Sequence, residues 1–377
     1  MASPELYSQE NSRDNERTQA NGRLRVLSDL SFTGSSVLLR ADLDVLPLEQ
    51  DGPGARLTSI RASLDYILAH GAQRVILLGH IGRPDGIVDP SVSTYHLIDP
   101  LQEVLGREVA FAPDFTHVLD GQVILFENLR FWSGETSRAV EEREEFIEEL
   151  EQMGDIFVND AFGTCHREHA SIVGLPQVLL SAAGRQIEKE VGAFEELFAR
   201  PKEGFVTIIG GAKIKDKLPL INRLAPYSEY ILVGGLLPKE VDPGRYELSV
   251  EGREIIVLPD NAIVADLREN TLDISEDSAH HFESIIKRLQ TTTVFWNGPM
   301  GKFENEEAAY GTNVIADATA YITRVNDAFT FVGGGETEKC VRRRKLSSLL
   351  THVSNGGGAS LEYAIKKSLP GIDALRD

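Results

Sequence analysis

The chain has 377 residues, and its content of 42% hydrophobic and 25% charged residues is typical of a globular protein. One ordinary hydrophobic core does not extend over this length, so we expect two domains. The 38 Lys and Arg residues stand against 58 Asp and Glu residues, and the formal net charge of −20 argues against nucleic acids and anionic membranes as partners.

The cysteines and the N-terminal segment bear on where the protein works. Cys165 and Cys340 are the two cysteines, and they cannot form a disulfide framework or a Cys-x-x-Cys metal site. We therefore expect a reducing compartment, the cytoplasm. No apolar run reaches the ~18 residues of a membrane span, so we expect no membrane association. Residues 1–22 are polar and lack the apolar stretch of a signal peptide, which predicts a disordered tail.

Short apolar runs alternate with helical patterns from residue 23 onward. The elements predicted in the first half are, in chain order, a strand at 36–45, a helix at 59–71, strands at 74–80 and 122–131, a helix at 143–154 and a strand at 155–163. Strands that are apolar on both faces and alternate with helices are typical of a parallel, doubly wound sheet.

A long amphipathic helix is predicted at 186–200, where Pro201 ends it, and the alternation then begins again. The second half has predicted strands at 205–211, 230–235, 292–298 and 329–335, an apolar segment at 254–266, and helices at 217–227, 278–290, 312–325 and from 359. We predict an α/β fold of two doubly wound, Rossmann-like, parallel-sheet domains joined by a long helix. The expected division is a tail at 1–22, a domain at 23–185 and a domain at 186–361, with 362–377 packing back on the first domain.

Charged side chains follow the strands of the first half, where open α/β sheets bind ligands. They are Arg40 and Asp42 in "RADLD", His80 and Arg83 in "GHIGRP", Arg130 in "ENLRF", and His166 and Arg167 in "CHREH". The planar guanidinium of arginine suits phosphate and carboxylate groups. Each arginine alone is more often a surface residue, but several at one edge of an acidic chain predict an anion-binding site. The spacing of His166 and His169 also allows a metal pair, although a hydrogen-bonding or anion-facing pair is the better interpretation.

Glycine-rich turns follow the strands of the second half. The turns are "GGAK", "VGG", "NGPMG", "VGGGET" and "NGGGAS", and neither a Walker A motif nor G-x-G-x-x-G is present. Glycine lets backbone N–H groups approach phosphates, and the helix after Gly358 offers the partial positive charge of its N-terminus. Lys213 and Lys217 lie one helical turn apart. One such turn is weak evidence, but the set predicts a nucleotide site.

As an ordered set, these loops resemble the phosphoglycerate kinase family, from about Leu24 to Gly371. The motifs that carry the resemblance are "RADLD", "GHIGRPDG", "ENLRF", "VNDAFGTCHREHAS", "GGAKIKDK", "VFWNGPMGKFE", "GGGET", "NGGGASLE" and "LPGI". The resemblance implies a two-domain, hinge-bending kinase of glycolysis, working as a monomer on small-molecule substrates. It would interconvert 1,3-bisphosphoglycerate and ADP with 3-phosphoglycerate and ATP, with Mg²⁺ as cofactor.

The resemblance also implies the residues of the site. On the phosphoglycerate side they are Asp42, Asp44, Ser59, His80, Arg83, Arg130 and Arg167. On the nucleotide side they are Gly211, Lys213, Lys217, Asn297, Glu304, Gly334, Gly335, Glu336 and Thr337, with Glu304 at the ribose and Glu336 at Mg²⁺. Catalytic roles would fall to Lys217, Arg83, Arg167, Gly357 and Gly358. The attacking substrate carboxylate is already ionised, so transfer needs positioning and charge stabilisation rather than a general base.

The sequence departs from the family's pattern at four places. Ser59 stands where the family has an arginine that grips the substrate, and Arg56 is a candidate replacement. Asp44 replaces an asparagine, and the segment 236–254 is shortened. Glu336 replaces an aspartate, and Asn355 stands where threonine is frequent. Three hypotheses stay open: an active phosphoglycerate kinase, a catalytically weak relative that binds nucleotide or phosphoglycerate as a sensor or partner protein, and a kinase of a related acid.

Overall fold

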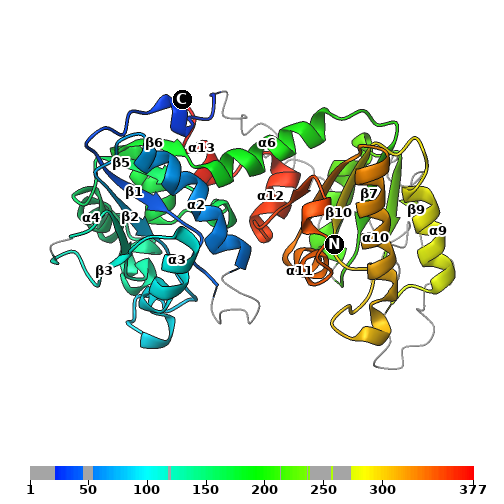
Figure 1. Ribbon diagram of the computed structural model, residues 1–377, viewed down its shortest axis with the longest axis horizontal. Coiled ribbons are helices and arrows are strands. Elements are labelled where there is room, and N and C mark those ends of the chain that lie inside the picture. The colour runs from blue at the N-terminus through cyan, green and yellow to red at the C-terminus, as the bar shows by residue number, and fades with distance from the viewer. Residues whose placement is uncertain are drawn as a thin grey trace, which may run out of the picture. The chain divides into compact units, whose positions relative to one another are not determined.

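A computed structural model describes residues 22–45, 54–117, 120–212, 214–235, 237, 256–257 and 273–377 (Figure 1). These residues form two compact units: unit 1 contains the described residues up to Ile187 and also Lys366–Asp377, and unit 2 contains those from Glu188 to Ile365. Most of the predicted tail and Lys213 lie outside the described residues, as does the shortened segment 236–254 apart from Leu237.

Unit 1 is built on a parallel sheet with the strand order β3-β4-β2-β1-β5-β6. The strands are β1 Ser36–Arg40, β2 Arg74–Leu78, β3 Ala110–Ala112, β4 Val123–Phe126, β5 Ile156–Asn159 and β6 Leu180–Ala183. Leu38 of β1 pairs in register with Ile76 on one side and Phe157 on the other. The predicted strand 36–45 ends at Arg40, and the residues after it form a loop.

Helices cover both faces of this sheet. The longer ones are α2 Gly54–Ala69, α3 Ile98–Leu105, α4 Val140–Glu151, α5 Leu175–Val178 and α13 Pro370–Asp373. Short helical turns lie at η1 Leu27–Asp29, η2 Pro90–Val92, η3 Thr94–Leu97, η4 Leu129–Phe131, η5 Ser133–Glu135, η6 Phe162–Thr164 and η7 Ala170–Gly174. Val37 and Leu39 of β1 pack with α2 and α3, whereas Leu38 packs with α4. Alternate residues of the strand therefore enter two separate cores.

Unit 2 repeats the plan with the strand order β12-β11-β10-β7-β8-β9. The strands are β7 Phe205–Ile209, β8 Tyr230–Val233, β9 Ile256–Val257, β10 Thr293–Asn297, β11 Phe329–Gly333 and β12 His352–Val353. The helices are α6 Arg185–Ala199, α7 Ile214–Leu224, α9 Glu276–Ile286, α10 Tyr310–Val325, α11 Gly335–Arg343 and α12 Gly358–Lys366, with short turns at η8 Ala225–Tyr227, η10 Glu306–Ala308 and η11 Ser347–Leu349.

Both faces of this second sheet are buried as well. Val294 and Trp296 of β10 pack in one core cluster with buried residues of α9 and α10. On the other face, the ring of Phe331 in β11 lies 4.5 Å from the ring of Phe194 in α6, measured between centroids. The prediction of two parallel-sheet α/β domains is confirmed. The sequence patterns missed several elements, among them α3, α5, α13 and the short strands β3, β6 and β12.

Helix α6 begins in unit 1 and continues into unit 2. Side chains of unit 1 hold its first turn: the backbone N–H of Arg185 donates to Ser63 Oγ at 2.8 Å, and that of Gln186 donates to Asp160 Oδ1 at 2.8 Å. The first N–H groups of a helix have no partner within the helix, so these contacts cap α6. None of the helices within the described residues is long and apolar enough to cross a membrane.

We predict that Leu38→Ala lowers the free energy of unfolding by about 2–5 kcal/mol, because the fully buried side chain leaves a cavity between β1 and its neighbours. The control is Leu180→Ala in the edge strand β6, whose side chain is already 53% exposed; its cost should stay below about 1 kcal/mol. Urea unfolding followed by tryptophan fluorescence and circular dichroism measures both. Equal losses in the two variants would contradict the burial of Leu38 in the core between β1 and α4.

Candidate active site

Four loops of unit 1 follow strands that are neighbours in its sheet, β4, β2, β1 and β5. Parallel strands end at one edge, so these loops lie side by side. Their predicted residues form what we call the basic edge: Asp42, Asp44, His80, Arg83, Arg130 and Arg167. Arg83 is exposed and Arg167 is half-buried, whereas only 2% of His80 and 4% of Arg130 is exposed. The edge therefore combines reachable cations with buried groups beneath them.

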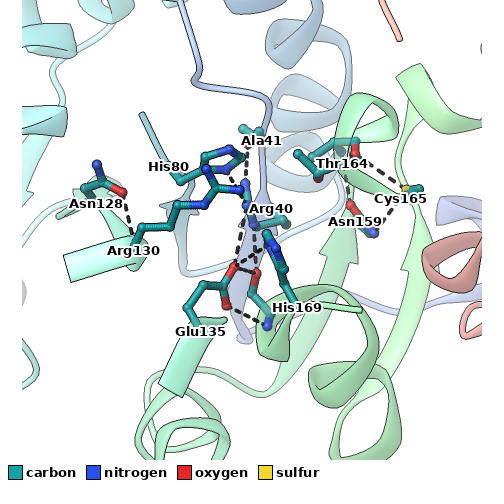
Figure 2. Close-up of polar contacts among 12 residues, drawn as sticks. Arg40, Ala41, His80, Asn128, Arg130, Glu135, Asn159, Thr164, Cys165 and His169 are labelled. Atoms are coloured by element: carbon teal, nitrogen blue, oxygen red, sulfur yellow. Dashed lines mark hydrogen bonds and ion pairs between the residues drawn. The ribbon is translucent and has the colours of Figure 1, made fainter. Parts of the chain in front are cut away.

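Arg40 is completely buried, and Figure 2 shows it among the side chains of His80, Glu135 and His169. Its Nε donates to Ser171 Oγ at 3.0 Å, its Nη1 to the carbonyl oxygen of Ala41 at 2.7 Å and its Nη2 to His80 Nδ1 at 2.9 Å. Burial lowers the pKa of Arg40, and the charge of Glu135 opposes that effect. Sequence reasoning grouped Arg40 with the arginines of the rim, but the structure places it below them, where it contacts protein groups.

Glu135 supplies the negative charge of this buried cluster. Its Oε1 lies 3.8 Å from Arg40 Nη2 and 3.6 Å from His169 Nδ1, and its side chain is fully buried. Ser171 donates its backbone N–H to Oε2 at 2.9 Å and its hydroxyl to Oε1 at 2.7 Å. Burial raises the pKa of Glu135, while Arg40 and the Ser171 hydrogen bonds lower it. A buried charge is tolerated when it is paired and hydrogen-bonded in this way.

The contact with Arg40 fixes the protonation state of His80. A guanidinium group has only donors, so His80 Nδ1 must accept, and the ring proton must lie on Nε2. Burial lowers the pKa of His80 well below its ordinary value, and the charges of Arg40 and Arg130 lower it further. Burial followed by the same two arginines lowers the pKa of His169 to about 3. Both histidines are therefore neutral at pH 7, and His80 is a fixed Nε2–H donor.

Arg130 is held by its own loop and by the loop after β2. Its backbone N–H donates to Asn128 Oδ1 at 3.1 Å, and its Nη1 donates to the carbonyl oxygen of Gly82. Burial lowers the pKa of Arg130 to about 10, and the neighbouring charges of Arg167 and Arg40 add to the effect. These cations repel each other when the site is empty of anions. An anionic ligand between them would relieve that repulsion.

The loop after β1 shows how the chain accommodates Ser59 and Asp44. Ser59 Oγ donates to the carbonyl oxygen of Arg56, one turn earlier in α2, and so stays on its own helix. Arg56 extends to the loop instead, with Nε 3.5 Å from Asp42 Oδ2 and Nη1 donating to the carbonyl oxygen of Asp44 at 2.8 Å. The Asp44 carboxylate accepts from the backbone N–H of Gly82 at 2.9 Å. Asp44 thus ties two loops of the basic edge together, which needs an acceptor and no amide donor.

The carboxyl ends of the unit 2 strands carry the glycine turns, and Asn297 lies among them at the end of β10. Lys217 of α7 donates its Nζ to Asn297 Oδ1. A Cβ on Gly334 would lie 3.0 Å from Asn297 Nδ2, and Gly334 also has a positive φ of 92°, so glycine is required there. Burial lowers the pKa of Lys217, and the charges of Glu336 and Asp216 oppose the effect. We call Gly211, Lys217, Asn297, Gly334, Gly335, Glu336 and Thr337 the glycine edge.

The turn "GGGET" forms the N-terminus of α11. Gly334 is its N-cap and makes no side-chain hydrogen bond, and Glu336 lies in the first turn. Thr337 is buried and accepts from the backbone N–H of Gly298 at 2.7 Å, which joins this turn to the loop after β10. A Cβ on Gly335 would meet open space, so no protein contact demands glycine there. The helix start presents uncapped N–H groups and a partial positive charge to a ligand.

The turn "NGGGAS" is anchored by a buried pair of unit 2. The Oε2 atom of Glu190 in α6 lies 3.0 Å from His352 Nε2, and the Oε1 atom accepts from the backbone N–H of Asn355 at 3.1 Å. Gly357 has a φ of 54°, and a Cβ on Gly357 or Gly358 would meet open space. The turn is thus held at its base and open at its glycines. Glu304 is exposed in the loop after β10, and Lys213 lies outside the described residues.

Comparisons with known proteins agree on one family. The phosphoglycerate kinase family model matches residues 27–240 and 248–367. The phosphoglycerate kinase of Frankia casuarinae is 37% identical, over 93% of this chain and 100% of that protein. The chain belongs to the phosphoglycerate kinase family. The phosphoglycerate kinase of Borrelia turicatae is 34% identical, over 93% and 99% of the two chains. The solved phosphoglycerate kinase of Pyrococcus horikoshii matches with a TM-score of 0.79 at 26% identity, and the match covers 93% of this chain and 98% of that protein.

Membership of the phosphoglycerate kinase family makes the chain a phosphotransferase of glycolysis and confirms the predicted family and enzyme class. The predicted residue roles remain predictions. Three side chains of the buried cluster under the basic edge were missed or misplaced by sequence reasoning: Arg40, Glu135 and Ser171. A charge at the end of the apolar strand "SVLLR" is a usable signal for Arg40. Glu135 sits in a short turn without periodicity, and no sequence pattern marks it.

We predict that His80 stays neutral, with its proton on Nε2, from pH 8 down to pH 5.5. Arg40 occupies Nδ1, and burial keeps the pKa of His80 well below its ordinary value of 6.5. Two-dimensional ¹H–¹⁵N correlation spectra of the imidazole nitrogens, with free imidazole as internal reference, give both tautomer and titration. A titration of His80 within this range, or a proton on Nδ1, would show that Arg40 does not hold the ring in this way.

Proposed function

We propose that this chain transfers a phosphoryl group reversibly between 1,3-bisphosphoglycerate and ADP on one side and 3-phosphoglycerate and ATP on the other. The observation that carries the proposal is the pairing of Lys217 with Asn297 beside the open glycine turn at the start of α11. A lysine there is directed to the place where nucleotide phosphates fit. Family membership and the basic edge of unit 1 support 3-phosphoglycerate as the phosphoryl acceptor.

The basic edge suits 3-phosphoglycerate, which carries a phosphate and a carboxylate. Arg83 and Arg167 offer guanidinium groups for its oxygen atoms, and Arg130 adds charge from below. His80 offers a neutral N–H donor whose strength does not change with pH near neutrality. Asp42 accepts hydrogen bonds, which suits the substrate hydroxyl. The acceptor is thereby bound with its carboxylate ionised and in no need of a base.

The glycine edge suits the nucleotide. Gly211 and Gly334, with φ values of 104° and 92°, let the backbone approach phosphate oxygens, and Thr337 supports the turn from below. Lys217 stabilises the phosphoryl group as it leaves the nucleotide, because its burial strengthens its field toward an anion. The N-termini of α11 and, after Gly357 and Gly358, of α12 add partial positive charge.

Glu336 is the residue that we propose for Mg²⁺. The described residues contain no group of three or more His, Cys, Asp or Glu side chains that could hold a metal ion. Magnesium is nevertheless usually held by one or two carboxylates together with substrate phosphates and water, and Glu336 lies at the helix start beside Lys217. The residues present therefore fit Mg²⁺ that arrives with the nucleotide. The bound ion would neutralise phosphate charge, and its water shell accommodates the longer side chain of Glu336.

Arg56 favours full activity over a catalytically weak relative. The arginine that the family pattern places at position 59 is absent, but the Arg56 guanidinium reaches the same loop and contacts Asp42 and Asp44. We propose that Arg56 binds the substrate in its place. We also propose that the protein is a monomer of the cytoplasm, where glycolytic substrates occur and a reducing environment keeps the buried Cys165 and Cys340 as thiols.

The proposed activity is tested by a coupled assay with 3-phosphoglycerate, ATP and Mg²⁺, in which the wild-type chain should turn over. Lys217→Met should lower kcat by about 10²–10³-fold, because a charge that acts on the transferring group is lost. Lys215→Met is the matched control: Lys215 is exposed on the same helix, and kcat should be unchanged. Wild-type chain that binds ATP in calorimetry without any turnover would support the weak relative instead.

Arg56→Met should lower kcat/KM for 3-phosphoglycerate by about 10²-fold, since a charge-assisted contact to the substrate is lost. Ser59→Arg should leave it unchanged, because Arg56 already fills the place. Arg61→Met on the same helix, where Arg61 pairs with Asp65, is the control and should behave like wild type. If Ser59→Arg instead raised activity by orders of magnitude, the natural site would be impaired.

A further inference from the structure

The side chain of Asp273 contacts both ends of one segment of unit 2, residues 301–311. Asp273 precedes α9 in the chain, and its side chain is partly buried. Its Oδ2 accepts from the backbone N–H of Gly311 at 2.8 Å, and its Oδ1 accepts from the backbone N–H of Ile274 at 2.9 Å. The backbone N–H of Tyr310 acts on the same carboxylate. Two of these three donors belong to the first residues of α10, which is remote from Asp273 in the sequence.

Helix α10 depends on this contact because its own N-cap position provides nothing. That position is Ala309, which makes no side-chain hydrogen bond. Alanine is a poor N-cap, and the first N–H groups of a helix need partners. Asp273, which lies just before α9, supplies the missing acceptor, and its negative charge also suits the positive end of the helix.

Two glycines leave room for the carboxylate. A Cβ on Gly311 would lie 2.6 Å from Asp273 Oδ1, and a Cβ on Gly301 would overlap the same atom. Gly301 ends the turn "NGPMG", and Gly311 lies at the start of α10. The carboxylate therefore touches both ends of the segment 301–311, which contains Glu304. Thr312 reinforces the closure, because its Oγ1 accepts from the backbone N–H of Met300 at 3.0 Å.

We propose that Asp273 is a positioning residue for nucleotide binding: it closes the segment 301–311 and so fixes Glu304 and the preceding turn at the glycine edge. This inference rests on the proposed function, in which that segment contacts the nucleotide ribose. Asp273 belongs to unit 2, whereas the proposed function assigns 3-phosphoglycerate to unit 1. Its loss should therefore affect one substrate and spare the other.

The test is Asp273→Asn in the full-length chain, assayed at pH 7.5. Burial raises the pKa of Asp273 to about 6, so the wild-type carboxylate is ionised there. The amide cannot accept with both of its polar atoms, which leaves backbone donors of α10 or Ile274 unpaired. The dissociation constant for ADP by calorimetry and the KM for ATP should each rise about tenfold. The KM for 3-phosphoglycerate should stay within about twofold, since no contact in unit 1 changes.

The matched control is Asp277→Asn, which removes the same charge from an exposed position in the first turn of α9 and should leave all three constants unchanged. A second variant, Gly311→Ala, places a Cβ that would overlap Ile274 Cγ1 and lie 2.6 Å from Asp273 Oδ1, so it displaces the carboxylate together with the neighbouring Ile274 side chain, at a position where helix propensity favours alanine. It should weaken ADP binding in the same selective way. If Asp273→Asn does not fold, the ADP affinity of Gly311→Ala tests the role of Asp273 instead.

The outcomes separate this inference from the proposed function. A lower melting temperature with unchanged ADP affinity would mean that Asp273 is merely structural and would overturn the inference, as would equal effects on both substrates. A wild-type chain that binds ADP without turnover would refute the proposed activity, yet calorimetry on the variants would still decide the role of Asp273. A wild-type chain that binds no ADP would overturn both.

Discussion

Parallel strands end at one edge of their sheet, and every candidate functional group described above depends on that constraint. In unit 1 the neighbouring strands β4, β2, β1 and β5 bring loops from distant parts of the sequence together. In unit 2, Asn297 at the end of β10 meets Lys217 after β7 and the glycines after β11 for the same reason. The backbone hydrogen bonds of each sheet fix the relative positions at which these loops begin.

The cations gathered at the basic edge repel one another, and the buried cluster under the edge limits that repulsion. Arg40 and Glu135 are fully buried and offset one another, while the hydroxyl and backbone N–H of Ser171 satisfy the carboxylate. Keeping His80 and His169 neutral avoids further positive charge where arginines already repel. The cluster thus leaves the surface cations available to a ligand and gives His80 one fixed hydrogen-bonding role.

The structure shows how the chain accommodates two departures from the family's pattern, Asp44 and Ser59. Asp44 acts through an oxygen atom that accepts from Gly82, and an asparagine would use the same atom. Ser59 folds back on its helix, and Arg56, one turn away, occupies the loop. Residues three or four apart lie on the same face of a helix, so an arginine at position 56 can reach the same loop as an arginine at position 59.

The sequence by itself determined the fold class, because apolar periodicity is a local pattern that one chain displays directly. The family followed from the resemblance of its ordered loop motifs, which the comparisons bear out, and the same motifs predicted the loops of the candidate site. It missed the short strands β3, β6 and β12, whose few residues carry too little periodicity. Only the tertiary structure decided that Arg40 is buried, that Glu135 balances it, and that Asp273 caps α10 from a distance. Those facts depend on pairing between remote residues under desolvation, and charge pairing across space leaves no trace in the spacing of residues along a chain.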